Sequence, residues 1–120
     1  MTFAIAYLAI CLGVILFHVA IIAGAPWGEL TQGGRQHGRL DRQGRITALV
    51  AIVITLAMVF AVLSAAGGWP NWPTWLAYPA LAMQGLSTYF NCITPSMAER
   101  KLWAPITVFM FALAFAAVFF

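Results

Sequence analysis

The chain has 120 residues, of which 63% are hydrophobic and only 8% are charged, and its formal net charge is +3. Soluble domains carry about 25% charged residues, so this composition excludes a water-soluble globular protein and predicts one integral membrane domain over residues 1–120. All six lysines and arginines fall in two loops, which favours membrane lipids as partners and argues against nucleic acid.

Four apolar segments are long enough to cross a membrane as helices. A hydrocarbon core of about 30 Å requires about 20 apolar residues in a helix. The runs lack the alternation of membrane barrel strands, so we predict an all-α, up-down four-helix bundle. Its helices are expected at about residues 2–24, 46–66, 74–92 and 102–120.

The first helix carries Tyr7, Cys11 and His18 at spacings that place them on one stripe. Residues 23–25 imitate a signal-peptidase site, but no basic stretch precedes this long run, so we expect a retained helix. Polar groups within lipid usually face the bundle interior. His18 is therefore either a structural hydrogen-bonding residue or one that contacts a ligand or transfers a proton.

The basic loops follow the first and third helices. Their basic residues are Arg35, Arg39, Arg42 and Arg45 in the first loop, and Arg100 and Lys101 in the other. The positive-inside rule predicts that both loops are cytoplasmic. Both termini and the Trp-Pro loop at 67–73 are then expected on the periplasmic side of a bacterial inner membrane.

The five tryptophans agree with this orientation because indole rings prefer the headgroup region. Trp27 and Trp103 fall near the predicted inner boundary, and Trp69, Trp72 and Trp75 fall near the outer one. We expect them to anchor the helix ends, and stacking on a ligand is the alternative role.

The third helix carries a second polar stripe, formed by Gln84, Ser87, Thr88 and Asn91. Gln84 lies at about the depth of His18, and the first and third helices are diagonal in a square bundle, so these two side chains are expected near the centre. With Asn91 above them and Glu29 and Glu99 at the rim, the sequence predicts a polar pocket open to the cytoplasmic side.

The candidate functional residues come from this pocket and from the basic loops. The ligand-binding candidates are His18, Gln84, Asn91, Arg35 and Arg100, and the candidates for acid–base catalysis are His18, Glu29 and Glu99. Gln84 and Asn91 also have a structural alternative as interhelical hydrogen-bonding residues. No metal site and no cofactor are predicted, because the His, Cys, Asp and Glu residues lack ligand spacing and residues 33–34 lack the context of a phosphate-binding loop.

The strip from Asn91 to Pro105 has the features of a helix boundary. Ser96 followed by Glu99 matches a capping box, in which two side chains satisfy free backbone N–H groups. Pro95 is expected to end the third helix, and Pro105 is tolerable in the first turns of the fourth.

Two motifs resemble those of a family of short four-span bacterial membrane proteins. GAPWGELTQGG, residues 24–34, is similar to the family's GAPWGE-type segment after the first helix. NCITPSMAERKLWAP, residues 91–105, matches its N-x-x-T-P-S-x-x-E-R-x-x-W-x-P strip before the last helix. The resemblance covers essentially the whole chain and implies four spans, but it implies no reaction. It directs attention to Trp27, Glu29, Asn91, Ser96, Glu99, Arg100 and Trp103.

Three functional hypotheses follow from the sequence. The leading one is a protein that binds a lipid-like or apolar ligand, or a partner membrane protein, through the pocket. The second is a membrane enzyme acting on a lipid or isoprenoid-like substrate, with Arg35 or Arg100 holding an anionic headgroup. The third is a structural subunit of a homo-oligomer or larger complex, with the phenylalanine-rich last helix as its contact face. Small multidrug transporters share only the length and the four spans, because their first helix carries an acid and this one carries His18.

Overall fold

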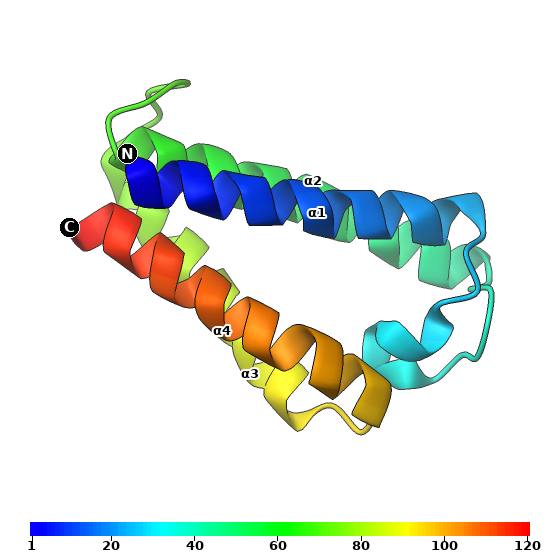
Figure 1. Cartoon of the computed structure of the whole chain (residues 1–120). Helices are drawn as coiled ribbons and strands as arrows, with labels where there is room; N and C mark the ends of the chain where they lie inside the picture. The colour runs from blue at the N-terminus through cyan, green and yellow to red at the C-terminus, as the bar shows by residue number, and fades with distance from the viewer.

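The computed structural model describes all 120 residues and is all-α, as predicted (Figure 1). The four long helices are α1 (Thr2–Ala23), α2 (Arg42–Ala65), α3 (Ala77–Ile93) and α4 (Met97–Phe119). Three short 3₁₀ turns are η1 (Gly28–Leu30), η2 (Gln32–Gly34) and η3 (Thr74–Leu76).

Three of the helices, α1, α2 and α4, are long and apolar enough to cross a membrane, with 22, 24 and 23 residues. The remaining helix, α3, has 17 residues, or about 25 Å of α-helix. The turn η3 ends directly before α3 begins, so helical backbone runs from Thr74 to Ile93. This combined segment reaches the length of about 20 residues that a span requires.

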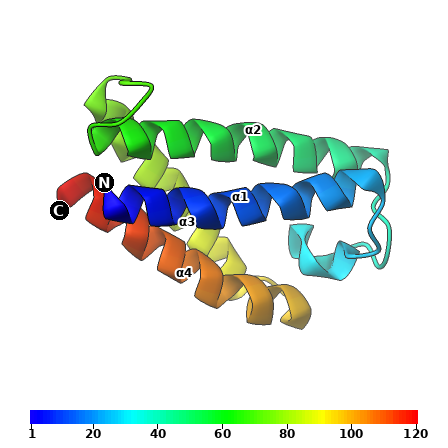
Figure 2. The same ribbon diagram turned by 45° about the horizontal axis from the view of Figure 1, so that its top comes forward.

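The helices form two antiparallel pairs, α1 with α2 and α3 with α4, that converge at one end and diverge at the other (Figures 1 and 2). Both termini and the loop before α3 lie at the narrow end, whereas the two basic loops lie at the wide end. Between the pairs, α1 packs on α4 and α2 packs on α3, so α1 and α3 lie diagonally, as the sequence predicted.

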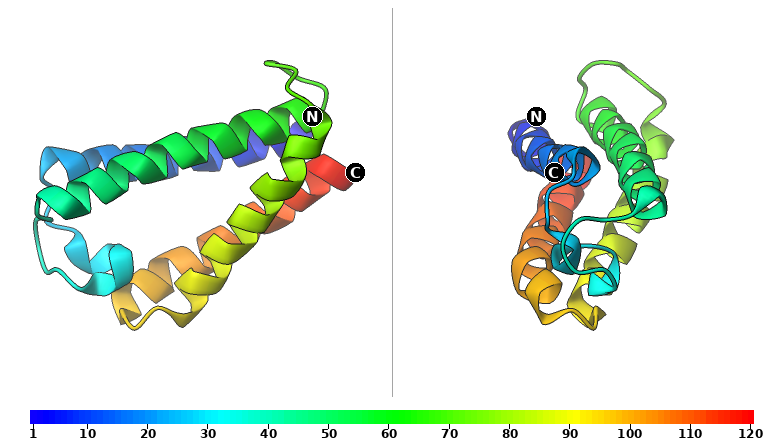
Figure 3. Two further views of the ribbon diagram at one scale, coloured as in Figure 1. Left: turned by 180° about the vertical axis from the view of Figure 1, so that it is seen from behind. Right: turned by 90° about the vertical axis from the view of Figure 1, so that its right-hand side faces the viewer.

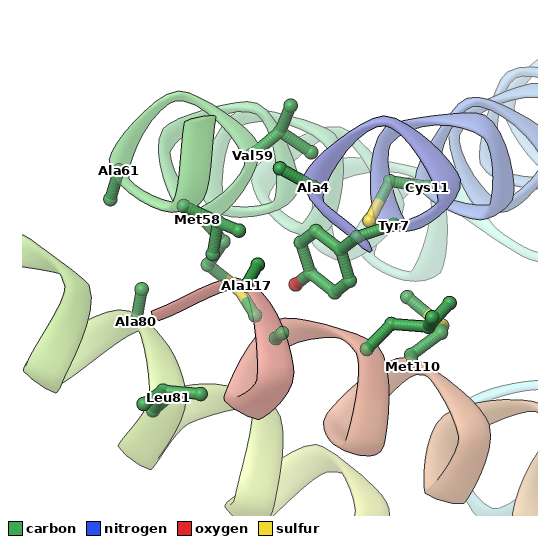
Figure 4. Close-up of a cluster of buried hydrophobic side chains, with 13 residues drawn as sticks. Ala4, Tyr7, Cys11, Met58, Val59, Ala61, Ala80, Leu81, Met110 and Ala117 are labelled. Carbon is green, nitrogen blue, oxygen red and sulfur yellow. The ribbon is translucent and has the colours of Figure 1, made fainter. Parts of the chain in front are cut away.

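Small side chains explain why the pairs converge. The buried core at the narrow end contains Ala4, Tyr7, Cys11, Met58, Val59, Ala61, Val62, Ala80, Leu81, Met110, Leu113, Ala114 and Ala117 (Figure 4). Alanine at facing positions lets helix backbones approach closely. At the wide end the second core cluster, Ile21, Leu40 and Ala48, joins α1 to α2 and to the loop before α2. Residues 28–34 fill part of the space between the separated pairs there (Figure 3).

Two helices begin earlier than the sequence predicted, and both begin at capping side chains. The helix α2 starts at Arg42 because the Asp41 carboxylate accepts a hydrogen bond from Gly44 N at 2.8 Å. The helix α4 starts at Met97 because Ser96 Oγ accepts one from the backbone N–H of Glu99 at 3.2 Å. Such caps satisfy backbone donors that have no partner within the helix. The prediction began each helix at its first apolar residues and so omitted a polar first turn.

Candidate functional site

A cavity of about 380 Å³ lies between the two helix pairs. This volume falls within the range of about 300–1,000 Å³ that is typical of small-molecule sites. Twenty residues line it, 11 of them hydrophobic, and they come from all four long helices and from Leu30–Gln32 of the first loop. The cavity therefore depends on how the pairs diverge and on how this loop folds beneath them.

The cavity opens sideways, between α2 and α3. Its exposed lining side chains all belong to these two helices: Ile54, Met83, Leu86 and Phe90. The lining side chains of α1 and α4 are buried or half-buried. We call these four exposed residues, which are all apolar, the mouth. The two helices that carry them, α2 and α3, lie nearest the viewer in the left view of Figure 3.

Four of the residues predicted from the sequence line this one cavity: His18, Gln84, Asn91 and Glu99. They come from three different helices, α1, α3 and α4. The structure thus brings together side chains that the sequence places up to 81 residues apart.

His18 is half-buried and its ring orientation follows from one hydrogen bond. Its Nδ1 lies 2.9 Å from the backbone oxygen of Val14. Because a carbonyl oxygen only accepts, Nδ1 carries the hydrogen of the neutral ring. The other ring nitrogen, Nε2, keeps its lone pair and has no partner within the chain.

The expected contact between His18 and Gln84 is not a hydrogen bond in the structure. Gln84 is buried, and its Oε1 accepts a hydrogen bond from the Tyr7 hydroxyl at 2.8 Å. The sequence analysis placed Tyr7 on the same stripe as His18 but did not assign it a partner. The Tyr7–Gln84 bond joins the diagonal helices α1 and α3 at the end of the cavity that faces the narrow end of the molecule.

Asn91 is anchored by its amide nitrogen, which donates to the backbone oxygen of Ser87 at 2.7 Å. Its Oδ1 is therefore left as an acceptor without a partner in the chain. Deeper in the cavity, Thr107 Oγ1 donates to the backbone oxygen of Trp103 at 2.7 Å. Thr107 was not among the residues that the sequence placed in the pocket, but it lines the cavity.

Glu99 is buried, with 8% of its surface exposed, rather than lying at an open rim as predicted. Its Oε2 accepts a hydrogen bond from the backbone N–H of Gly33 at 2.9 Å. The predicted capping box is therefore only half formed, since Ser96 caps the helix but the Glu99 carboxylate reaches the first loop instead. The N–H of Ser96 is satisfied by the Thr94 hydroxyl at 3.3 Å.

The two sequence motifs pack against each other. We call this unit, residues 28–34 with residues 96–103, the clasp. It contains three hydrogen bonds between the motifs: Gly33 N to Glu99 Oε2 at 2.9 Å, Ser96 Oγ to Glu29 O at 2.6 Å and Trp103 Nε1 to Leu30 O at 2.8 Å. Each one joins a backbone atom of the loop to a side chain of α4 or of its N-cap residue, Ser96, so the clasp fixes the loop beneath the cavity.

Aromatic rings extend the clasp to α1. Phe17 packs edge-on against Trp103, with ring centroids 4.9 Å apart, and stacks on Trp27 at 5.8 Å. His18 contacts the same phenylalanine edge-on at 5.5 Å. Trp103 is thus a structural element of the cavity wall, in addition to the interfacial role that the sequence predicted for it.

The remaining candidates lie away from the cavity. Glu29 is exposed and pairs with His37 at 2.7 Å. Arg100 is held by the backbone oxygen of Thr94, to which its Nη2 donates at 2.7 Å. Arg35 lines a separate polar hollow of about 260 Å³ in the first loop. None of the six basic residues lines the cavity, so the predicted ligand-binding residues Arg35 and Arg100 do not border it.

Comparisons of the chain with protein-family models, with curated proteins and with solved structures give no match. The resemblance to a four-span bacterial family therefore stays a prediction from the two motifs. The contacts of the clasp give those motifs a shared structural role in this chain.

Proposed function

We propose that this chain is a four-span membrane protein that binds a lipid-like amphiphile, which enters the cavity from the side. The observation that carries this proposal is the combination of an apolar mouth on α2 and α3 with polar groups inside the same cavity. A molecule with a hydrocarbon tail and a polar head matches both parts. Ligand sites in proteins are generally apolar clefts with a few convergent polar groups.

The four-span arrangement supports lateral entry. If the segment from Thr74 to Ile93 crosses the bilayer with the other three helices, the mouth faces acyl chains rather than water. The basic loops at the wide end then lie in the cytoplasm of a bacterial cell, by the positive-inside rule. The ligand's head would sit near the inner leaflet, because the polar cavity residues are concentrated toward that end.

Cysteine labelling tests the orientation. In a background with the exposed Cys92 changed to Ser and the buried Cys11 retained, we would introduce Arg39→Cys, Lys101→Cys and Asn71→Cys separately. A membrane-impermeant thiol reagent added to intact cells is expected to label only the last variant. Labelling of the Arg39 and Lys101 variants from opposite sides would overturn the four-span topology.

Ligand binding is tested by mass spectrometry of small molecules that co-purify in mild detergent. We expect an amphiphile with the unaltered chain, and its loss when Leu86→Trp fills the mouth. Leu12→Trp is the matched control, since Leu12 and Leu86 are 50% and 52% exposed but Leu12 lies outside the cavity. Retention of the amphiphile by both variants, or co-purification of a polypeptide and no small molecule, would contradict this function.

A second candidate function is a membrane enzyme acting on a lipid or isoprenoid-like substrate. It is favoured by the presence of His18 and Glu99 in one cavity, since imidazole and carboxyl groups are the commonest acid–base catalysts. Lipid extracts from cells carrying His18→Gln or Glu99→Gln would be compared with those of a deletion strain. Accumulation of one lipid in all three supports an enzyme, whereas identical extracts from the deletion and wild-type strains exclude it.

A further inference from the structure

The charge inside the cavity has one sign. Glu99 is the only carboxylate among the lining residues, and no lysine or arginine lines the cavity. The nearest basic residue in sequence, Arg100, is turned to the backbone oxygen of Thr94. A carboxylate removed from water is costly unless a positive charge or hydrogen-bond donors satisfy it.

Glu99, His18 and Asn91 each present acceptor atoms to the cavity. The Glu99 carboxylate accepts from Gly33 N through Oε2 and lies beside the Thr94 hydroxyl, and its two oxygens have room for further donors. His18 Nε2 is an acceptor, because Nδ1 carries the hydrogen that faces the Val14 carbonyl. Asn91 Oδ1 is also free, because the amide nitrogen is bonded to Ser87 O.

A headgroup that donates hydrogen bonds and carries positive charge fits this arrangement. A primary ammonium group has three donors and no acceptor, which matches the acceptor atoms that Glu99, His18 and Asn91 present to the cavity. An anionic headgroup would face the Glu99 carboxylate with no basic side chain to hold it. Arg35 and Arg100, to which the sequence suggested a role in anion binding, do not line this cavity.

We propose that the cavity binds a cationic amphiphile through its primary ammonium group. The head would contact Glu99, His18 and Asn91, and the tail would lie along Met58 and leave between α2 and α3. This assignment rests on the proposed function, and it adds the chemical class of the ligand. The ammonium group can belong to a free long-chain amine or to the ethanolamine head of a membrane lipid.

The test compares three probes that differ only in the head: dodecylamine, dodecanol and dodecanoate. A twelve-carbon tail is chosen because the lining of α4 extends from Glu99 to Met110, or about 16 Å along the helix. The chain would be placed in phosphatidylcholine nanodiscs, and binding would be measured by equilibrium dialysis against empty discs. We expect saturable binding of dodecylamine, with the other two probes at least about tenfold weaker.

The variant Glu99→Gln keeps an oxygen for Gly33 N but removes the charge. It is expected to weaken dodecylamine binding about tenfold and to leave dodecanol binding unchanged. Preserved dodecanol binding also shows that the variant is folded, and the three-probe comparison on the unaltered chain needs no variant. Glu29→Gln is the matched control, because this exposed carboxylate lies at the same end but outside the cavity.

Each result has a distinct meaning. Equal binding of the three probes overturns the ammonium assignment but leaves the amphiphile-binding function in place, and absence of saturable binding by all three overturns both. Equal effects of the Glu29 and Glu99 variants assign the attraction to surface charge and overturn the ammonium site. Phosphatidylethanolamine is then added to the discs. If it reduces dodecylamine binding, the natural ligand is a lipid with an ethanolamine head; if dodecylamine binding is undiminished, the natural ligand is a free amine.

Discussion

Replacing Gly34 by alanine should separate the first loop from α4. Gly34 has a φ of +68°, and a Cβ at this position would lie 2.6 Å from Ser96 Cβ and 2.8 Å from Ser96 Oγ. The added methyl group therefore enters the space occupied by the residue that caps α4. Ser96 cannot move freely, since its hydroxyl also donates to Glu29 O at 2.6 Å.

Two costs add in this variant. A left-handed backbone costs alanine about 1–2 kcal/mol, and inserting a methyl group into a packed contact costs about 1–3 kcal/mol. Gly34→Ala is thus expected to lower the free energy of unfolding by about 2–5 kcal/mol. Gly38→Ala isolates the first cost, because Gly38 has a φ of +79° and a Cβ there would meet nothing within 4 Å.

The assay is equilibrium unfolding of the purified chain by titration with sodium dodecyl sulfate in mixed micelles. Gly34→Ala should be less stable than Gly38→Ala by about 1–3 kcal/mol, the cost of the steric contact alone. Equal losses of stability in the two variants would refute the packing of the loop against Ser96. A double variant with Gly34→Ala and Ser96→Gly should recover part of the difference, because it removes the colliding side chain.

Two further substitutions test single hydrogen bonds by the same titration. Trp103→Phe removes the indole N–H that donates to the first loop and should lower the free energy of unfolding by about 0.5–1.5 kcal/mol. The control Trp75→Phe, at a residue 62% exposed, should leave the free energy of unfolding almost unchanged. Equal effects of the two substitutions would argue against the clasp. Tyr7→Phe leaves Gln84 Oε1 without its donor and should cost about 1–3 kcal/mol. Tyr78→Phe, at a residue 58% exposed, is its control, and an unchanged midpoint for Tyr7→Phe would contradict the bond between α1 and α3.

The helices could be predicted because the composition leaves few alternatives. Long apolar runs separated by polar loops fix the number and the approximate positions of the helices. The first residues of α2 and α4 were harder to predict, because a polar first turn resembles a loop in sequence until its capping residue is recognised. Ser96 was recognised as a cap from its spacing to Glu99, whereas Asp41 was not.

The candidate site was predictable in part for a similar reason. Polar side chains are rare in these helices, and those in lipid usually turn inward, so His18, Gln84 and Asn91 could be assigned to one pocket. The mouth could not be predicted, since it depends on the angle between the two helix pairs. That angle follows from which alanines meet at the narrow end, and the sequence does not give these pairings.

The clasp connects the position of the first loop to the charge of the cavity. The loop contributes backbone atoms to it, namely Glu29 O, Leu30 O and Gly33 N, and α4 contributes the side chains. Of these side chains, only Glu99 has a second oxygen that makes no hydrogen bond to the loop, because Oε2 accepts from Gly33 N. The same carboxylate therefore orders the loop and provides the negative charge of the cavity. This double role explains why Glu99 lies beside Arg100 and Lys101 in sequence yet is buried away from both: its partner is a backbone N–H 66 residues earlier.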